Sequence, residues 1–105
     1  MLCCLYYLWC KAPAMNASEI TSAMATLHPD WKQEGITLQR TFSFSNFVEA
    51  FSFMTSVALV AEHLNHHPNW SNVYNTVEVS LSTRDAGGIT PKDFALAMEM
   101  DKLVD

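Results

Sequence analysis

The fold is decided by residues 36–66, ITLQRTFSFSNFVEAFSFMTSVALVAEHLNH, in which the spacing of the apolar side chains changes once. Over residues 36–44 apolar and polar residues alternate, which is typical of a strand with one buried face. Arg40 is the single interruption of the apolar face. From residue 46 onward the apolar residues recur three and four apart, which predicts a helix over residues 46–66 that is capped by Ser45 or Asn46.

The flanking sequence predicts further helices and strands. These are a helix over residues 18–27 that begins at Ser18, an extended segment from Trp31 with a tight turn at residues 34–35, a strand or strand pair over residues 73–83, and a last helix. Thr90, Pro91 and Asp93 are typical of a helix start, with Asp93 as a capping carboxylate at the third position. The whole pattern predicts an α+β fold in which three helices pack on one face of an antiparallel four-stranded sheet.

The helix over residues 46–66 carries two apolar stripes rather than one. Phe47, Phe51, Met54, Ala58 and Ala61 form one stripe, and Phe53, Val57, Val60 and Leu64 form the other. Packing on one sheet needs a single stripe. We therefore expect the second stripe to lie in an interface, which predicts a homodimer or homotetramer built on this helix.

Composition excludes several classes of protein. The 105 residues suffice for one compact domain. Half of them are apolar and only 16% are charged, so the chain can build a core. A net charge of −5 without a basic cluster argues against a nucleic-acid surface. The apolar run at the start stops at Lys11, which is too short for a membrane span.

Residues 1–15 differ from the rest and are expected to be a leader, with the domain over residues 16–105. The segment is expected to be disordered or non-native, with targeting or lipid attachment at Cys3 and Cys4 as alternatives. All three cysteines lie in it, which excludes a disulfide scaffold. The domain is expected in the cytoplasm, with the nucleus as a further location.

Two adjacent histidines, His66 and His67, followed by Pro68, are the strongest candidates for chemistry. An imidazole exchanges protons near neutral pH, so two in one pocket can deliver and remove protons in a dehydration. The alternative is that one ring caps the helix end. A zinc pair of His63 and His67 is disfavoured because Leu64 stands where zinc proteases have their general-base glutamate. No metal site is expected.

The chain resembles the pterin-4a-carbinolamine dehydratase family over about residues 18–103. The family signature is matched by Glu62, then His66-His67-Pro68, then Tyr74, and finally Asp93, with the spacing kept. Further matches include residues 40–44, 51–59, 72–75, 81–83 and 87–90. The resemblance implies dehydration of 4a-hydroxytetrahydropterin to quinonoid dihydropterin, as in tetrahydrobiopterin recycling, by a homo-oligomer that needs no cofactor.

The resemblance also implies roles for individual residues. His66 would be the main proton-transfer group, His67 would orient the pterin and share the acid–base work, and Asp93 would support the pocket. The implied substrate-binding residues are Glu62, Pro68, Trp70, Tyr74, Thr83 and Asp93.

One signature position departs from the family, because Arg84 replaces the usual third histidine. Arginine donates hydrogen bonds but is not a base at neutral pH. Arg84 is therefore a catalytic candidate only as a donor, and an active or partly active enzyme is expected. Two alternatives stay open: a pterin-binding pseudoenzyme, and a dimerisation cofactor for a transcription factor through the long helix, as in animal members.

Overall fold

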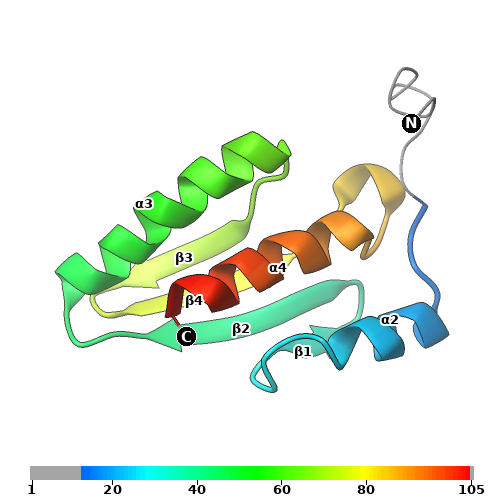
Figure 1. Ribbon diagram of the computed structural model, residues 1–105, viewed down its shortest axis with the longest axis horizontal. Coiled ribbons are helices and arrows are strands. Elements are labelled where there is room, and N and C mark those ends of the chain that lie inside the picture. The colour runs from blue at the N-terminus through cyan, green and yellow to red at the C-terminus, as the bar shows by residue number, and fades with distance from the viewer. Residues whose placement is uncertain (1–12, 105) are drawn as a thin grey trace.

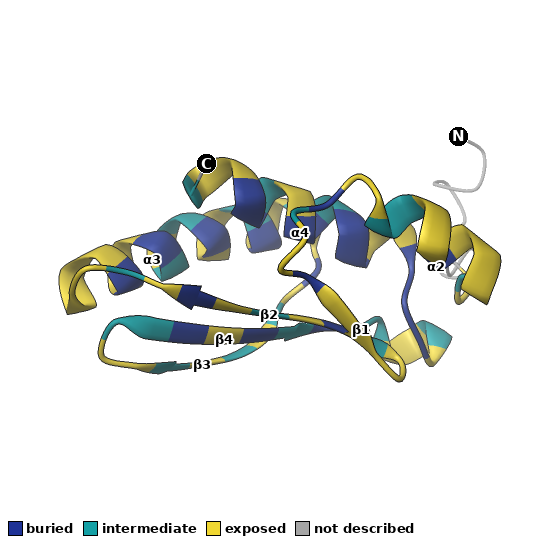
Figure 2. Cartoon of the chain, turned by 90° about the horizontal axis from the view of Figure 1, so that it is seen from below, coloured by how far each residue is buried: buried dark blue, intermediate teal, exposed yellow. Residues whose placement is uncertain are grey.

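The computed structural model describes residues 13–104. Along the chain they form α2 (Ala17–Met24), β1 (Lys32–Glu34), β2 (Thr37–Ser43), α3 (Phe47–Leu64), β3 (Asn69–Val73), β4 (Thr76–Leu81), a 3₁₀ turn η1 (Arg84–Ala86) and α4 (Pro91–Val104). The strands make one antiparallel sheet in the order β1-β2-β4-β3. Helices α3 and α4 lie side by side over one face (Figure 1), and α2 lies in the same helical layer (Figure 2). The predicted fold class is confirmed.

The core lies between the sheet and the two long helices. Leu38 faces Leu81 and Phe42 faces Val77 across the β2–β4 pair, and all four are buried. Buried and exposed residues alternate along β2 and β4 (Figure 2). The polar members of these strands therefore cover the opposite face, which no described helix covers.

Helix α3 begins after Asn46, whose side chain accepts the N–H of Glu49, so the predicted cap is confirmed. The expected interface stripe is wrong for Phe53 and Val57, which are buried in the protein's own core. The reason is an aromatic stack, because the Phe53 ring lies 4.7 Å from the ring of Phe42, centroid to centroid. The large apolar residues that α3 leaves exposed are Phe47, Val48, Phe51 and Leu59.

By length and apolar composition α3 also meets the requirement of a membrane span. The core helix of a globular protein meets the same requirement, and one row of α3 packs on the sheet and on α4. The apolar character of α3 is therefore accounted for in part by the core.

Two predicted boundaries are wrong. The first helix begins after Asn16 rather than Ser18, because Asn16 and Glu19 cap each other: the Asn16 side chain accepts the Glu19 N–H (2.8 Å), and the Glu19 carboxylate accepts the Asn16 N–H (2.9 Å). For residues 73–83 the strand-pair alternative is confirmed but its bounds are wrong, because the pair spans residues 69–81 and the chain reverses at Tyr74 and Asn75, where Tyr74 has a φ of 52°. Val73 therefore belongs to β3 and is exposed.

The expected leader falls mostly outside the described residues, since residues 1–12 are not described. The predictions for Cys3 and Cys4 lie there. The N–H of Met15 donates to the carbonyl of Ile89 (2.8 Å). The backbone is therefore attached to the domain already at residue 15.

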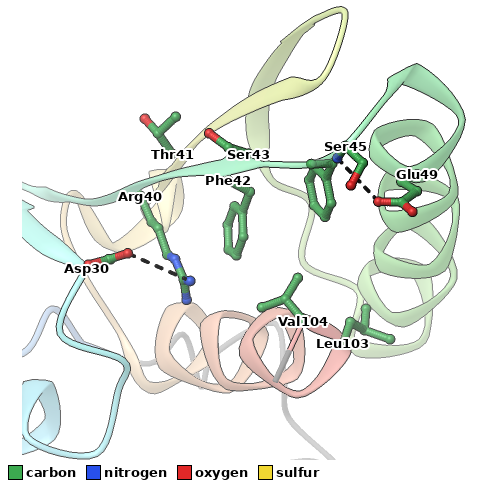
Figure 3. Close-up of a pocket in the computed structure, with 10 residues that line it drawn as sticks. Asp30, Arg40, Thr41, Phe42, Ser43, Ser45, Glu49, Leu103 and Val104 are labelled. Atoms are coloured by element: carbon green, nitrogen blue, oxygen red, sulfur yellow. Dashed lines mark hydrogen bonds and ion pairs between the residues drawn. The ribbon is translucent and has the colours of Figure 1, made fainter.

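Arg40 lies on the core face of β2, where its charge is neutralised inside the fold. Its guanidinium donates to Asp101 of α4 (2.6 Å) and lies 4.3 Å above the ring of Phe42. The same Asp101 oxygen accepts the indole N–H of Trp31 (2.8 Å). Arg40 also lines a hollow where β2 ends, with Asp30, Phe42 and Val104 (Figure 3). This hollow lies at the opposite end of the sheet from the two adjacent histidines.

Candidate active site

Helix α3 ends in a turn that leaves the side chain of His66 free to contact another element. Asn65 adopts the left-handed conformation (φ 54°, ψ 43°), which asparagine tolerates better than most residues. The N–H of Asn65 donates to the carbonyl of Glu62 (3.1 Å), and the N–H of His66 donates to the carbonyl of Ala61 (3.0 Å). His66 thus caps the helix with its backbone, not with its ring.

The partner of the His66 ring is Asp93, in the first turn of α4. Nε2 of His66 lies 2.5 Å from Oδ1 of Asp93, and both residues are buried. Oδ2 of Asp93 accepts the hydroxyl of Thr83 and the N–H of Thr90, both at 2.9 Å. The predicted capping role of Asp93 is confirmed by the Thr90 bond, and the His66 contact is a second role that capping alone did not predict.

This geometry assigns the two ring nitrogens of His66 to different tasks. A carboxylate only accepts hydrogen bonds, so Nε2 of His66 carries the hydrogen that faces it. Among the described residues Nδ1 of His66 has no hydrogen-bond partner, and this atom is accessible to solvent. Nδ1 is therefore the nitrogen that can exchange a proton with a bound molecule.

Two threonines fix the carboxylate from the other side. The Oγ1 atoms of Thr83 and Thr90 lie 2.6 Å apart, and Thr90 Oγ1 accepts the N–H of Lys92 (3.3 Å). Because the single hydroxyl hydrogen of Thr83 goes to Asp93, the hydroxyl of Thr90 must donate to Thr83. Thr83, which follows β4, and Thr90, which precedes α4, thus hold Asp93, and Asp93 holds His66.

His67 lies next to His66 on an open cleft of about 650 Å³. Its Nε2 is 2.9 Å from a carboxylate oxygen of Glu62, and both side chains are largely exposed. The cleft is lined by Asn65, His66, His67, Pro68, Asn69, Ser80, Ser82, Thr83, Arg84, Asp85 and Lys92. One buried, oriented imidazole and one solvated imidazole therefore share the same cleft.

The structure brings together most of the predicted site residues but not the two aromatic ones. Pro68, Thr83 and Arg84 line the cleft, and Glu62 reaches it through His67. Trp70 lies opposite Val79 and packs against the core, so it is not among the lining residues. Tyr74 lies in the β3–β4 turn at the far end of the hairpin. In this chain neither ring reaches the cleft.

Two residues of the site were missed from the sequence, Thr90 and Lys92. Thr90 was assigned only as a helix cap, and nothing in a linear pattern indicates that its hydroxyl contacts Thr83. Lys92 is the second residue of α4, next to the buried Asp93, and lines the cleft. Its position next to Asp93 was the available signal, since both lie in the first turn of α4.

The alternative of a zinc pair has no support in the geometry. His63 lies with Leu59, Leu64 and Met98 in a groove between α3 and α4, whereas His67 lies in the cleft. Within residues 13–104 no group of three or more histidine, cysteine, aspartate or glutamate side chains is arranged to hold a metal ion.

Comparison with known proteins decides the family. The model of the family described as pterin 4 alpha carbinolamine dehydratase matches residues 13–103. The chain belongs to the pterin-4a-carbinolamine dehydratase family. The matched range includes His66, Asp93 and the residues that line the cleft.

Relatives and solved structures agree with this assignment. A Prochlorococcus marinus protein named after the dehydratase family is 56% identical over 93 residues, which are 89% of this chain and 97% of that protein. A Mesorhizobium japonicum protein with the same family name is 53% identical over 89 residues, covering 83% and 90%. The crystal structure of a transcriptional coactivator/pterin dehydratase from Brucella melitensis has a TM-score of 0.84 and 36% identity, covering 88% and 99%.

A more distant structure shares only the fold. A pterin dehydratase-like protein described as a RuBisCO assembly factor in the alpha-carboxysome has a TM-score of 0.62 at 24% identity, over 72% of this chain and 90% of that one. The dehydratase fold therefore also occurs in a protein whose described role is assembly.

Proposed function

We propose that the cleft dehydrates a 4a-hydroxytetrahydropterin to the quinonoid dihydropterin. The observation that carries the proposal is the buried His66–Asp93 pair on the wall of an open cleft, in a chain of the dehydratase family. The reaction breaks the C4a–O bond, removes the proton of N5 and forms a C4a=N5 double bond, with water as the other product. It needs one proton delivered and one removed, and no cofactor.

His66 would deliver the proton. Its ring, protonated at Nδ1, would donate to the departing 4a-hydroxyl while Asp93 holds Nε2–H and stabilises the positive charge of the imidazolium. The two bonds from Thr83 and Thr90 keep that carboxylate oriented. A group placed by this many contacts is oriented before the substrate arrives, which is what acid–base catalysis requires.

His67 would remove the proton from N5. Its side chain is 61% exposed, so it can release that proton to solvent and return to its starting state. Glu62 orients the ring through the 2.9 Å contact. Arg84 would donate hydrogen bonds to the substrate, because a guanidinium carries no lone pair to act as a base.

The test is the dehydration rate of freshly made 4a-hydroxytetrahydropterin above its spontaneous rate. We expect His66→Asn to lower the catalysed rate by about 10²–10⁴-fold, the usual contribution of an acid–base group. His63→Asn is the matched control, since His63 lies in the last turn of α3, three residues before His66, but outside the cleft. A His66→Asn protein as fast as the natural one would refute the proposal.

A second candidate function, not exclusive of the first, is assembly through the exposed row of α3. Phe47, Val48, Phe51 and Leu59 are exposed on one helix, and exposed large apolar side chains gathered together mark contact surfaces. We propose that this row joins copies of the chain into a dimer or tetramer. A protein partner on the same row is the alternative, and subunit-exchange experiments with a tagged copy distinguish the two.

A further inference from the structure

The cleft is lined by more positive than negative side chains, although the chain as a whole is negatively charged. The chain carries a net charge of −5 and only six lysines and arginines, yet two of the six, Arg84 and Lys92, line the cleft. Asp85 is the single carboxylate among the lining residues. The hollow at the other end of the sheet has the reverse balance, with Arg40 against Asp30 and Glu49.

Neither cation of the cleft is neutralised by the fold. Within residues 13–104, Arg84 and Lys92 form no ion pair, whereas Arg40 is bound by Asp101 and Lys102 by Glu99. The positive charges in the cleft are therefore available to a ligand.

Helix stability does not explain Lys92. It lies in the first turn of α4, next to Asp93, where the positive end of the helix favours acidic residues and disfavours a lysine. Arg84 stands in the exposed η1 turn, and its guanidinium makes no hydrogen bond to another described residue. Because neither Arg84 nor Lys92 stabilises the local structure around it, the two cations indicate that the cleft binds an anionic ligand.

We propose that the cleft binds pterins whose side chain carries an anionic group, a phosphate or a carboxylate. The inference rests on the proposed function and names its substrate class. With the ring beside His66 and His67, the anionic group would bind Arg84 and Lys92. Guanidinium forms paired hydrogen bonds with both kinds of anion, and the lysine adds a point charge.

The experiment measures the affinity of the full chain for three pterins that differ only at the side chain: 6-hydroxymethylpterin, its phosphate ester and 6-carboxypterin. Fluorescence titration at low salt reports each dissociation constant. We expect at least one anionic pterin to bind about 10-fold to 100-fold tighter than the neutral one, the range of a charged hydrogen bond. Comparison of the two anions tells phosphate from carboxylate.

Variants assign the effect to the cleft. In the double variant Arg84→Gln/Lys92→Gln, affinity for the anionic pterin should fall much more than affinity for 6-hydroxymethylpterin, so that the preference drops below about 2-fold. Lys32→Gln is the control, because it removes one exposed positive charge on β1, outside the cleft. Raising the salt to about 0.3 M should reduce the preference in the natural protein but not in the double variant.

Three results would overturn the inference. The first is equal affinity for neutral and anionic pterins, and the second is a preference that survives the double variant. The third is an equal loss of affinity for all three pterins in Arg84→Gln, which would mean that Arg84 binds the pterin ring rather than its side chain. A dehydration assay on a neutral carbinolamine then shows whether such a result refutes only the preference for anionic pterins or the dehydratase function as well. Turnover of the neutral substrate without anionic preference refutes only the inference, whereas absence of both turnover and pterin binding refutes the proposed function as well.

Discussion

Replacing Asp93 by asparagine should reverse the tautomer of His66 while the fold survives. The amide nitrogen must take the place of one carboxylate oxygen. At the Oδ2 position it would face the N–H of Thr90, donor against donor, in a fully buried site. At the Oδ1 position it would face only Nε2 of His66, which can give up its hydrogen and accept.

The second arrangement leaves no buried donor unpaired, so we expect it. An unpaired buried group costs about 1–3 kcal/mol, which decides between the two orientations. Stability should then fall by only about 1–2 kcal/mol, since α4 loses a charge at its N-terminus and the charged hydrogen bonds become neutral ones. Urea unfolding measures this loss. The catalysed rate should fall by up to about 10⁴-fold, because the neutral His66 ring then carries its hydrogen on Nδ1 instead of Nε2, and no carboxylate holds the ring.

Nitrogen NMR of the imidazole checks the cause directly. The natural protein should show hydrogen on Nε2 when the ring is neutral, and Asp93→Asn should show it on Nδ1. Asp30→Asn, which removes an exposed carboxylate outside the cleft, should change neither the tautomer nor the rate. An unchanged tautomer with a rate within about 3-fold of the natural one would refute the assignment of the two ring nitrogens.

Three further predictions concern the framework of the site. Asp101→Ala should destabilise the fold by about 3–5 kcal/mol in urea, because it leaves the buried charge of Arg40 with only the exposed and more distant carboxylate of Asp30, 4.0 Å away. A loss below about 1 kcal/mol would contradict this. Asn65→Ala should lower the free energy of unfolding by about 1–2 kcal/mol, because alanine disfavours the left-handed conformation of residue 65. Asn65→Gly should leave it unchanged. Equal melting temperatures for the two variants would show that the turn is unstrained. Phe51→Ser should reduce the mass seen in sedimentation with little loss of stability, while Phe53→Ala should cost about 3–5 kcal/mol; the opposite pattern would reverse the two faces of α3.

Local patterns in the sequence were sufficient for the class of fold and for half of the site. Alternation identified β2, and the cap at Asn46 placed the start of α3 correctly, because both depend on residues close in the chain. The pairing of His66 with Asp93 spans 27 residues and was not predicted, since the resemblance to a family implied only that Asp93 supports the pocket. Spacing alone described Asp93 as a helix cap, which is true but incomplete.

The errors have physical causes of the same kind. Two apolar stripes on α3 are equivalent in the sequence, and only packing against Phe42 decides that Phe53 is inside. The position of the β3–β4 turn was missed because Tyr74, rather than glycine or asparagine, takes the positive φ. That turn sends Tyr74 away from the cleft, and no linear spacing predicts such a reversal.

The N–H of Thr90 is bound by the same carboxylate that orients His66. Its rate of exchange with deuterium therefore measures how often the start of α4 lifts away from the sheet, and each such opening also releases the imidazole. A single amide proton is thus a reporter of the time the site spends assembled. A distant substitution will slow catalysis by this route, without touching the cleft, once exchange at Thr90 shows that the site is open for a large fraction of the time.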